Sequence, residues 1–249
     1  MPRPPAPLAA LLVALALVAA GCGSDDDSET TGEGAAKQSK PAAKAPAPVP
    51  APAPKEAVTG ECQKVKAPKP RPGAKASKPK TTLDAAKTTT AVVTTSCGEF
   101  TIALDVSQAP TTASSFASLA RKGFYDGLTF HRIVAGFVIQ GGDPQGDGEG
   151  GPGYKVVEAP PSTITYPRGT VAMAKAPTEA PGTSGSQFFV VTAENASSPP
   201  FSLTSDYALV GKVTKGLEVV QRIGALPADS QTEKPDTPVV IQRVKIQEG

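Results

Sequence analysis

The most informative segment of the chain is Phe130-His131-Arg132-Ile133-Val134-Ala135-Gly136-Phe137-Val138-Ile139-Gln140-Gly141-Gly142-Asp143. It places an arginine and a glutamine in a largely apolar run. Because alternate residues of a strand point to opposite faces, regular alternation would separate Phe137 from Arg132 and Gln140. A glycine inside a strand often marks a bulge or bend. A break at Gly136 would therefore bring these three side chains to one surface, suited to holding an extended apolar peptide.

Short strand-like runs recur between residues 88 and 249, separated by turns that contain glycine and proline. Ser96-Cys97-Gly98 predicts a tight hairpin turn between the first two runs. Apolar residues at helical spacing follow Pro110 and stop at Gly123, and a second short helix is predicted over residues 217–223. Many short strands with two helices favour a closed antiparallel barrel. The predicted strands are residues 91–95, 99–105, 129–133, 137–140, 170–174, 187–191, 208–213 and 239–247.

A set of motifs in one colinear order resembles the cyclophilin family of peptidyl-prolyl cis-trans isomerases. The resemblance extends from about residue 91 to the C-terminus. It implies a mainly β fold, a closed eight-stranded antiparallel β-barrel capped by two α-helices. The motifs are the segment quoted above, Gly123-Phe124-Tyr125-Asp126-Gly127, the glycine-rich stretch from Gly141-Gly142-Asp143-Pro144 to Gly153-Tyr154, Gly185-Ser186-Gln187-Phe188-Phe189 and Leu209-Val210-Gly211-Lys212-Val213.

Rotation about an X–Pro bond breaks amide resonance against a barrier of roughly 20 kcal/mol. No new bond forms, so the resemblance implies catalysis without nucleophile, metal or cofactor, by tighter binding of the twisted amide. Loss of resonance returns a lone pair to the proline nitrogen, which then accepts a hydrogen bond. A guanidinium held in a pocket with little water stabilises that state. The predicted catalytic donor is Arg132, which matches the arginine of the family's Phe-His-Arg motif.

The resemblance also assigns the substrate-binding positions. The proline pocket is formed by Phe137, Val138, Phe189 and Leu203. Gln140 and Gln187 bind the peptide backbone, and residues 174–176 form the edge along which the peptide lies. Tyr207 replaces a pocket histidine of the family, and Ser202 stands where cyclosporin-sensitive members carry tryptophan, which implies weak cyclosporin binding. The binding positions are Phe137, Val138, Gln140, Ala174, Lys175, Ala176, Gln187, Phe189, Leu203 and Tyr207.

Other functions fit the residues less well. The chain has one histidine, His131, and residues 182–186 do not form the Gly-x-Ser-x-Gly motif of a serine hydrolase. The acidic residues of 146–151 lack the spacing of a calcium-binding loop. One alternative stays open: a cyclophilin-fold module or chaperone that binds proline-containing segments with little turnover.

The N-terminus has the pattern of an export signal. Residues 8–20 are apolar but too few to span a bilayer as a mature helix. They lead into Ala19-Ala20-Gly21-Cys22, which resembles a bacterial lipobox. The sequence therefore predicts a signal peptide over residues 1–21, lipidation of Cys22 and an extracytoplasmic domain anchored to the bacterial cell membrane. An ordinary cleaved signal that happens to precede a cysteine is the alternative.

Residues 22–87 are rich in alanine, proline and lysine, which predicts a disordered tether in front of an isomerase domain at residues 88–249. The basic last third of this tether suits either contact with anionic wall polymers or lipid, or a solubilising linker. Export would place Cys62 and Cys97 in an oxidising compartment. The sequence does not decide whether they form a disulfide or remain two free thiols.

The expected partners follow from the same features. They are proline-containing polypeptides, unfolded or extended, and the membrane through the lipid anchor. A net charge of +2 gives no reason to expect nucleic acid, and no zinc site is expected because no histidine accompanies the cysteines. We expect a monomer.

Overall fold

The predicted hairpin at Ser96-Cys97-Gly98 joins the first two strands of the chain. The computed structural model describes residues 61–249, in which β1 (Thr89–Thr95) pairs antiparallel with β2 (Gly98–Leu104). Val93 lies opposite Phe100, and both side chains are buried. Alternation along these strands therefore sends one row of apolar side chains inward, as the sequence pattern predicts.

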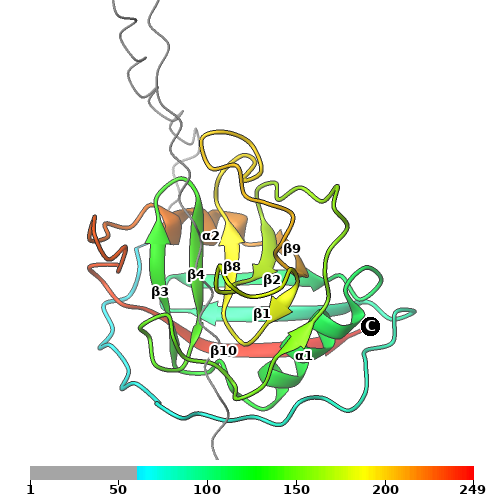
Figure 1. Ribbon diagram of the computed structural model, residues 1–249. Coiled ribbons are helices and arrows are strands. Elements are labelled where there is room, and N and C mark those ends of the chain that lie inside the picture. The colour runs from blue at the N-terminus through cyan, green and yellow to red at the C-terminus, as the bar shows by residue number, and fades with distance from the viewer. Residues whose placement is uncertain (1–60) are drawn as a thin grey trace, which may run out of the picture. The chain divides into compact units, whose positions relative to one another are not determined.

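The strands close into an antiparallel barrel in the order β1-β10-β3-β4-β8-β6-β9-β2 (Figure 1). The predicted eight-stranded barrel with two helices is thus confirmed. A separate pair, β5 (Val156–Val157) with β7 (Thr183–Ser184), lies outside the barrel order. The remaining barrel strands are β3 (Leu128–Val134), β4 (Val138–Asp143), β6 (Thr170–Met173), β8 (Phe188–Val191), β9 (Leu209–Lys215) and β10 (Val239–Glu248).

Two helices pack against the barrel. Helix α1 (Pro110–Arg121) begins with a proline, which suits a first turn because the N–H it lacks has no intrahelical acceptor there. Helix α2 (Leu217–Gly224) follows Gly216, whose φ is +74° and where a Cβ would lie 2.3 Å from the Glu99 carbonyl oxygen. Helix α1 contacts β9 and β10, whereas α2 contacts β2 and β4.

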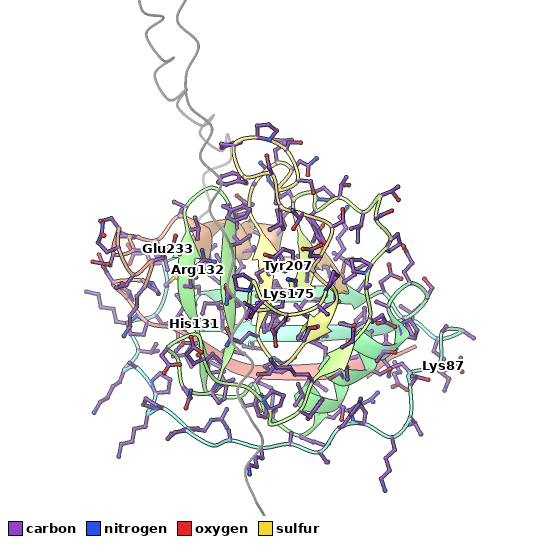
Figure 2. The ribbon with its side chains drawn as sticks, in the orientation of Figure 1. Lys87, His131, Arg132, Lys175, Tyr207 and Glu233 are labelled. Atoms are coloured by element: carbon purple, nitrogen blue, oxygen red, sulfur yellow. A yellow bond between two sulfur atoms is a disulfide. The ribbon has the colours of Figure 1, made fainter. Side chains whose placement is uncertain are left out.

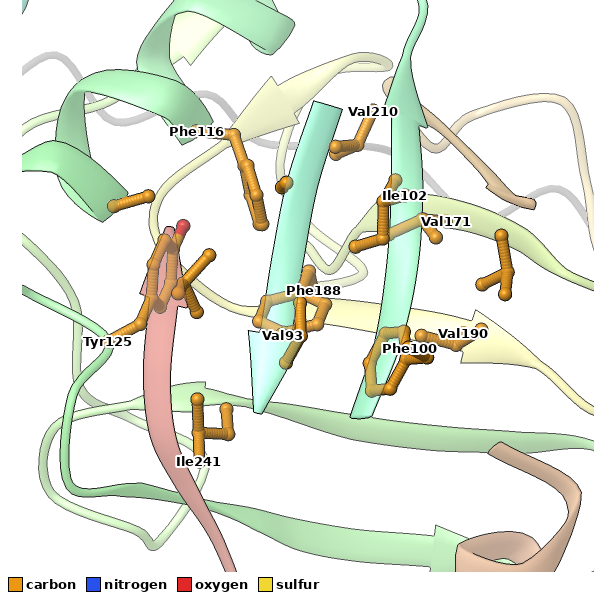
Figure 3. Close-up of a cluster of buried hydrophobic side chains, with 14 of the residues drawn as sticks. Val93, Phe100, Ile102, Phe116, Tyr125, Val171, Phe188, Val190, Val210 and Ile241 are labelled. Carbon is orange, nitrogen blue, oxygen red and sulfur yellow. The ribbon is translucent and has the colours of Figure 1, made fainter. Parts of the chain in front are cut away.

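Phe188 lies at the centre of the main hydrophobic core (Figure 3). Its ring meets Phe116, Tyr125 and Phe130 at centroid distances of 5.4, 5.6 and 5.8 Å, in each case close to edge-to-face. This arrangement is favourable for aromatic rings. It also fixes the inner face of β8 and leaves Phe189, the next residue, to face the opposite side.

The break predicted at Gly136 is a complete reversal of the chain. Gly136 has a φ of +70° between the antiparallel strands β3 and β4, and the Phe137 N–H donates to the Val134 carbonyl at 2.9 Å. A short loop with one left-handed residue is a common hairpin connection. The reversal pairs Arg132 with Gln140 across the two strands.

Residues 61–83, here called the strap, run along the surface of the barrel before β1 (Figure 1). A disulfide joins Cys62 to Cys97, the Arg71 N–H donates to the Pro144 carbonyl at 2.7 Å, and the Leu83 N–H donates to Ser114 Oγ at 2.8 Å. Residues 61–87 therefore differ from the unstructured tether expected for residues 22–87.

The strap is ordered because it attaches through backbone hydrogen-bond donors and through a few short apolar side chains. Among these, Ala74 and Leu83 pack against the main core. Residues 1–60, including Cys22 and the predicted signal peptide, lie outside the described residues. Within residues 61–249, no helix has the length and apolar character needed to cross a membrane.

Candidate functional site

Arg132 lies on β3 between two polar partners, Glu233 and Gln140. Figure 2 labels Arg132 and Glu233, which lie next to each other. Arg132 Nε forms an ion pair with Glu233, and its Nη1 donates a hydrogen bond to Gln140 Oε1 at 3.1 Å. Glu233 comes from the loop between α2 and β10, whereas Gln140 is the cross-strand partner of Arg132 on β4. The guanidinium is therefore held from two sides, and no contact within residues 61–249 occupies Nη2.

The hydrogen bonds continue beyond Gln140. Its Nε2 donates to Gln187 Oε1 at 3.0 Å, and Gln187 Nε2 donates to the carbonyl oxygens of Gly148 and Gly150 at 2.7 and 2.9 Å. We call the series Glu233, Arg132, Gln140, Gln187 and these two carbonyls the polar chain. Arginine donates hydrogen bonds but accepts none, so the Gln140 amide must turn its oxygen towards Arg132. The Gln140 nitrogen then donates to the Gln187 oxygen, which orients the second amide.

A second apolar cluster, separate from the main core, lies next to the polar chain. Val138 and Phe189 are almost fully buried at its base, whereas Phe137, Leu203 and Tyr207 are partly exposed above them. The predicted pocket residues thus divide into a buried floor and an accessible wall. Accessible apolar and aromatic side chains of this kind are the usual lining of a ligand-binding site.

Two aromatic contacts shape this wall. The rings of Phe137 and Phe201 stack with centroids 4.3 Å apart and planes 10° apart. Tyr207 meets Phe189 nearly edge-on at 5.5 Å, and its backbone N–H donates to Tyr166 Oη at 3.1 Å. Burial raises the pKa of Tyr166 to about 12, so its hydroxyl stays neutral and also donates to the Tyr207 carbonyl.

A groove of about 540 Å³ adjoins the polar chain and is lined by Gln140, Gln187, residues 174–176 and the glycine-rich stretch. The N–H groups of Ala174 and Ala176 are bonded to the Gln187 carbonyl and the Glu179 carboxylate. Within the described chain the backbone N–H of Lys175 has no bond, which leaves it available to an extended peptide. The Lys175 ammonium lies 5.6 Å from the Tyr207 ring centroid (Figure 2).

The structure brings all of the predicted catalytic and binding residues together at the polar chain, the second apolar cluster or the groove. Sequence reasoning missed Glu233 and Tyr166, which come from segments without a recognisable motif. Phe201, which is not among the predicted binding residues, stacks on Phe137. Among residues 61–249, no three or more His, Cys, Asp or Glu side chains gather as metal ligands would.

Residues 90–246 match the family model described as cyclophilin type peptidyl-prolyl cis-trans isomerase/CLD. The chain is 39% identical over 162 residues to peptidyl-prolyl cis-trans isomerase-like 1 of Neurospora crassa, covering 64% of this chain and 94% of that protein. It is 38% identical over 176 residues to peptidyl-prolyl cis-trans isomerase B of Streptomyces anulatus, covering 63% and 95%.

The chain is also similar to a solved structure of a cyclophilin type isomerase. The crystal structure of a cyclophilin type peptidyl-prolyl cis-trans isomerase of Cryptosporidium parvum, in the presence of the dipeptide Ala-Pro, matches with a TM-score of 0.57 and 30% identity. The match covers 64% of this chain and 99% of that chain. The family model, the relatives and the fold therefore all point to one family.

His131 is buried beside Arg132, and neither ring nitrogen meets a hydrogen-bond partner in the described chain. Burial lowers its pKa, and the nearby Asp143 carboxylate opposes this only in part. The unfolded chain, with an ordinary histidine pKa of about 6.5, binds the proton more tightly than the folded chain. The free energy of unfolding should therefore fall as the pH drops from about 6.5 towards the lower pKa of the folded state.

We expect this loss in urea denaturation of the wild-type chain between pH 7.5 and pH 5.5, and a smaller loss in His131→Gln, which has no imidazole. Because the chain has one histidine, its imidazole signals in an NMR titration are unambiguous. A ring that titrates at or above pH 6.5 in the folded protein would contradict the prediction.

Proposed function

We propose that this chain, which belongs to the cyclophilin-type peptidyl-prolyl cis-trans isomerase family, acts on X–Pro bonds of exported polypeptides from a lipid anchor on a bacterial membrane. The isomerase activity follows from the family match over residues 90–246. Exported clients and the anchor are inferred from the export signal and from Cys22 at the end of the lipobox-like segment. The single observation that carries the catalytic mechanism is the placement of Arg132 beside an apolar pocket.

The mechanism begins with binding of the substrate proline on the wall formed by Phe137, Leu203 and Tyr207. Burial of the ring removes water from the X–Pro amide, which strengthens any hydrogen bond made there. The polypeptide backbone lies along residues 174–176 and is held by Gln187. These contacts bind both planar isomers of the bond and the twisted amide alike, so they set affinity.

Rate acceleration requires an interaction that is stronger in the twisted amide. As resonance is lost, the proline nitrogen becomes pyramidal and gains a lone pair. The Nη2 group of Arg132 has no bond within the described chain and is free to donate to that lone pair. The planar amide nitrogen is a very poor acceptor, so this bond forms mainly in the transition state and lowers the barrier.

Replacement of Arg132 tests the mechanism. We expect Arg132→Ala to lower kcat/KM by roughly 100- to 1000-fold, the usual effect of losing a donor to the transition state, with the fold unchanged. The measurement is NMR exchange between the cis and trans forms of a short Ala-Pro peptide, with circular dichroism to check folding. Arg168→Ala is the matched control, because Arg168 pairs with Glu194 and lines no part of the groove.

Equal acceleration by wild type and Arg132→Ala would refute the proposed donor. A wild-type chain that binds the peptide without accelerating exchange would instead favour the binding module considered above.

Glu233 is proposed as a positioning residue for Arg132. Glu233→Gln keeps an oxygen that accepts from Arg132 Nε, whereas Glu233→Ala removes it. Because small displacements of a reacting group are costly, we expect Glu233→Ala to lower kcat about tenfold with little change in KM. Glu233→Gln should recover most of this loss. If both variants match Glu194→Ala, a control for loss of an acidic surface residue, Glu233 has no positioning role.

The proposed location depends on Cys22. Two or three acyl chains on this residue would hold the protein firmly, since each buried methylene contributes about 0.8 kcal/mol. Clients emerging from export are unfolded, and their X–Pro bonds isomerise uncatalysed over tens of seconds, which is slow enough to limit folding. An isomerase anchored at that surface would meet them at high local concentration.

Cys22→Ser tests the anchor. We expect the wild-type chain in the membrane fraction of the expressing bacterium and the Cys22→Ser chain in the soluble extracytoplasmic fraction, with unchanged kcat/KM. Immunoblotting of the fractions and mass spectrometry of the N-terminal peptide supply the measurement. Membrane association that survives Cys22→Ser, or an N-terminal cysteine without acyl chains, would rule the anchor out.

A further inference from the structure

The strap contacts the outer side of the glycine-rich loop, here defined as residues 144–153. The Arg71 N–H donates to the Pro144 carbonyl at 2.7 Å, and the Ala76 N–H donates to the Pro152 carbonyl at 2.9 Å. At Gly153 an added Cβ would lie 3.2 Å from Lys75 Cγ, so the Lys75 side chain of the strap packs closely against the loop there. Both ends of the loop are thus bonded to the strap.

The inner side of the same loop forms part of the substrate groove. The carbonyls of Gly148 and Gly150 accept the two hydrogen bonds of Gln187 Nε2 and end the polar chain. The Asp143 carboxylate accepts from the backbone N–H groups of Asp147 and Gly148. With glycine at many positions, this loop has a large conformational entropy to lose when it is ordered, so its few attachments determine its position.

The strap itself is fixed at identifiable points. The Arg71 guanidinium donates through Nη2 to the Phe124 carbonyl at 2.6 Å and lies 5.9 Å from the centroid of the Phe124 ring. At its N-terminal end the disulfide joins Cys62 to Cys97, and the Gln63 N–H donates to the Ser96 carbonyl at 2.8 Å. Arg71 and the disulfide therefore connect the strap to two separate parts of the barrel.

We propose that the strap is a positioning element of the isomerase groove, held by Arg71 and the Cys62–Cys97 disulfide, and that it keeps the glycine-rich loop where Gly148 and Gly150 orient Gln187. This inference rests on the proposed function, in which Gln187 binds the substrate backbone. Release of the strap weakens substrate binding through Gln187. It leaves kcat nearly unchanged, because Glu233 and Gln140 still hold Arg132.

Arg71→Ala tests the side chain that fixes the strap, in the full-length chain. We expect KM for an Ala-Pro peptide, and its dissociation constant from NMR titration, to rise about fivefold, with kcat within a factor of two of wild type. Arg71→Lys keeps a charged donor and should recover part of the affinity. Lys66→Ala is the matched control, since Lys66 is an exposed cation of the strap without a hydrogen bond or ion pair in the described structure.

A second readout separates positioning from general stability. Amide hydrogen exchange should accelerate at residues 145–150 in Arg71→Ala, while the barrel strands keep the protection of the wild-type chain. If Arg71→Ala matches Lys66→Ala in KM and in loop protection, the strap does not position the groove.

Reduction tests the disulfide in the same assay. A dithiol converts the Cys62–Cys97 bond into two thiols and is itself oxidised to a disulfide, with two electrons and two protons transferred. In full-length Cys22→Ser, which leaves no third cysteine, we expect the dithiol to raise KM about as much as Arg71→Ala does. The chain with Cys62→Ser and Cys97→Ser should show the raised KM with or without the dithiol.

The outcomes distinguish this inference from the proposed function. If neither the dithiol nor Arg71→Ala changes KM, while Arg132→Ala abolishes turnover, only the positioning role of the strap is overturned. A wild-type chain without turnover overturns the proposed function, and peptide affinity then still decides whether the strap positions the groove.

Discussion

The polar chain depends on one asymmetry, that arginine donates hydrogen bonds and accepts none. Gln140 must therefore turn its oxygen towards Arg132, which leaves its nitrogen to donate to Gln187, and Gln187 in turn donates to Gly148 and Gly150. Each bond polarises the next in the same direction. The barrel order supplies the spacing, because β3, β4 and β8 are consecutive neighbours. Residues far apart in the sequence thus share one orientation that is set at Arg132.

The candidate site could be predicted from the sequence because three of its members, Arg132, Phe137 and Gln140, lie in one short segment with a break at Gly136. The sequence did not reveal that the break reverses the chain, so Arg132 and Gln140 are cross-strand partners rather than residues of one bent strand. No sequence motif pointed to Glu233. It is 101 residues from Arg132, and its position depends on a loop that returns to β3, where the Ile133 N–H donates to the Glu233 carbonyl at 2.7 Å.

The prediction from composition that the strap is part of an unstructured tether was wrong for a physical reason. A segment with so few large apolar side chains buries too little surface to offset its backbone entropy, which is why composition predicts a free tether. The strap instead attaches through backbone hydrogen bonds and one disulfide, and neither can be counted from residue types. Its prolines also reduce the entropy that ordering removes, because their φ angles are already restricted. The sequence left the pairing of Cys62 and Cys97 open, and that pairing bears directly on the position of the strap.

The ion pair between Arg132 and Glu233 reduces the positive field that a catalytic guanidinium would otherwise exert. Rotation about an X–Pro bond creates no net charge, however; it localises an electron pair on one nitrogen. Stabilisation of that pair depends on the direction of one N–H more than on a long-range field. With side chains 37% and 36% exposed, the pair contributes little to folding stability, since water screens it. Its main effect is therefore to restrict the orientation of the guanidinium, which leaves Nη2 as the donor that the proposed mechanism assigns to the proline nitrogen.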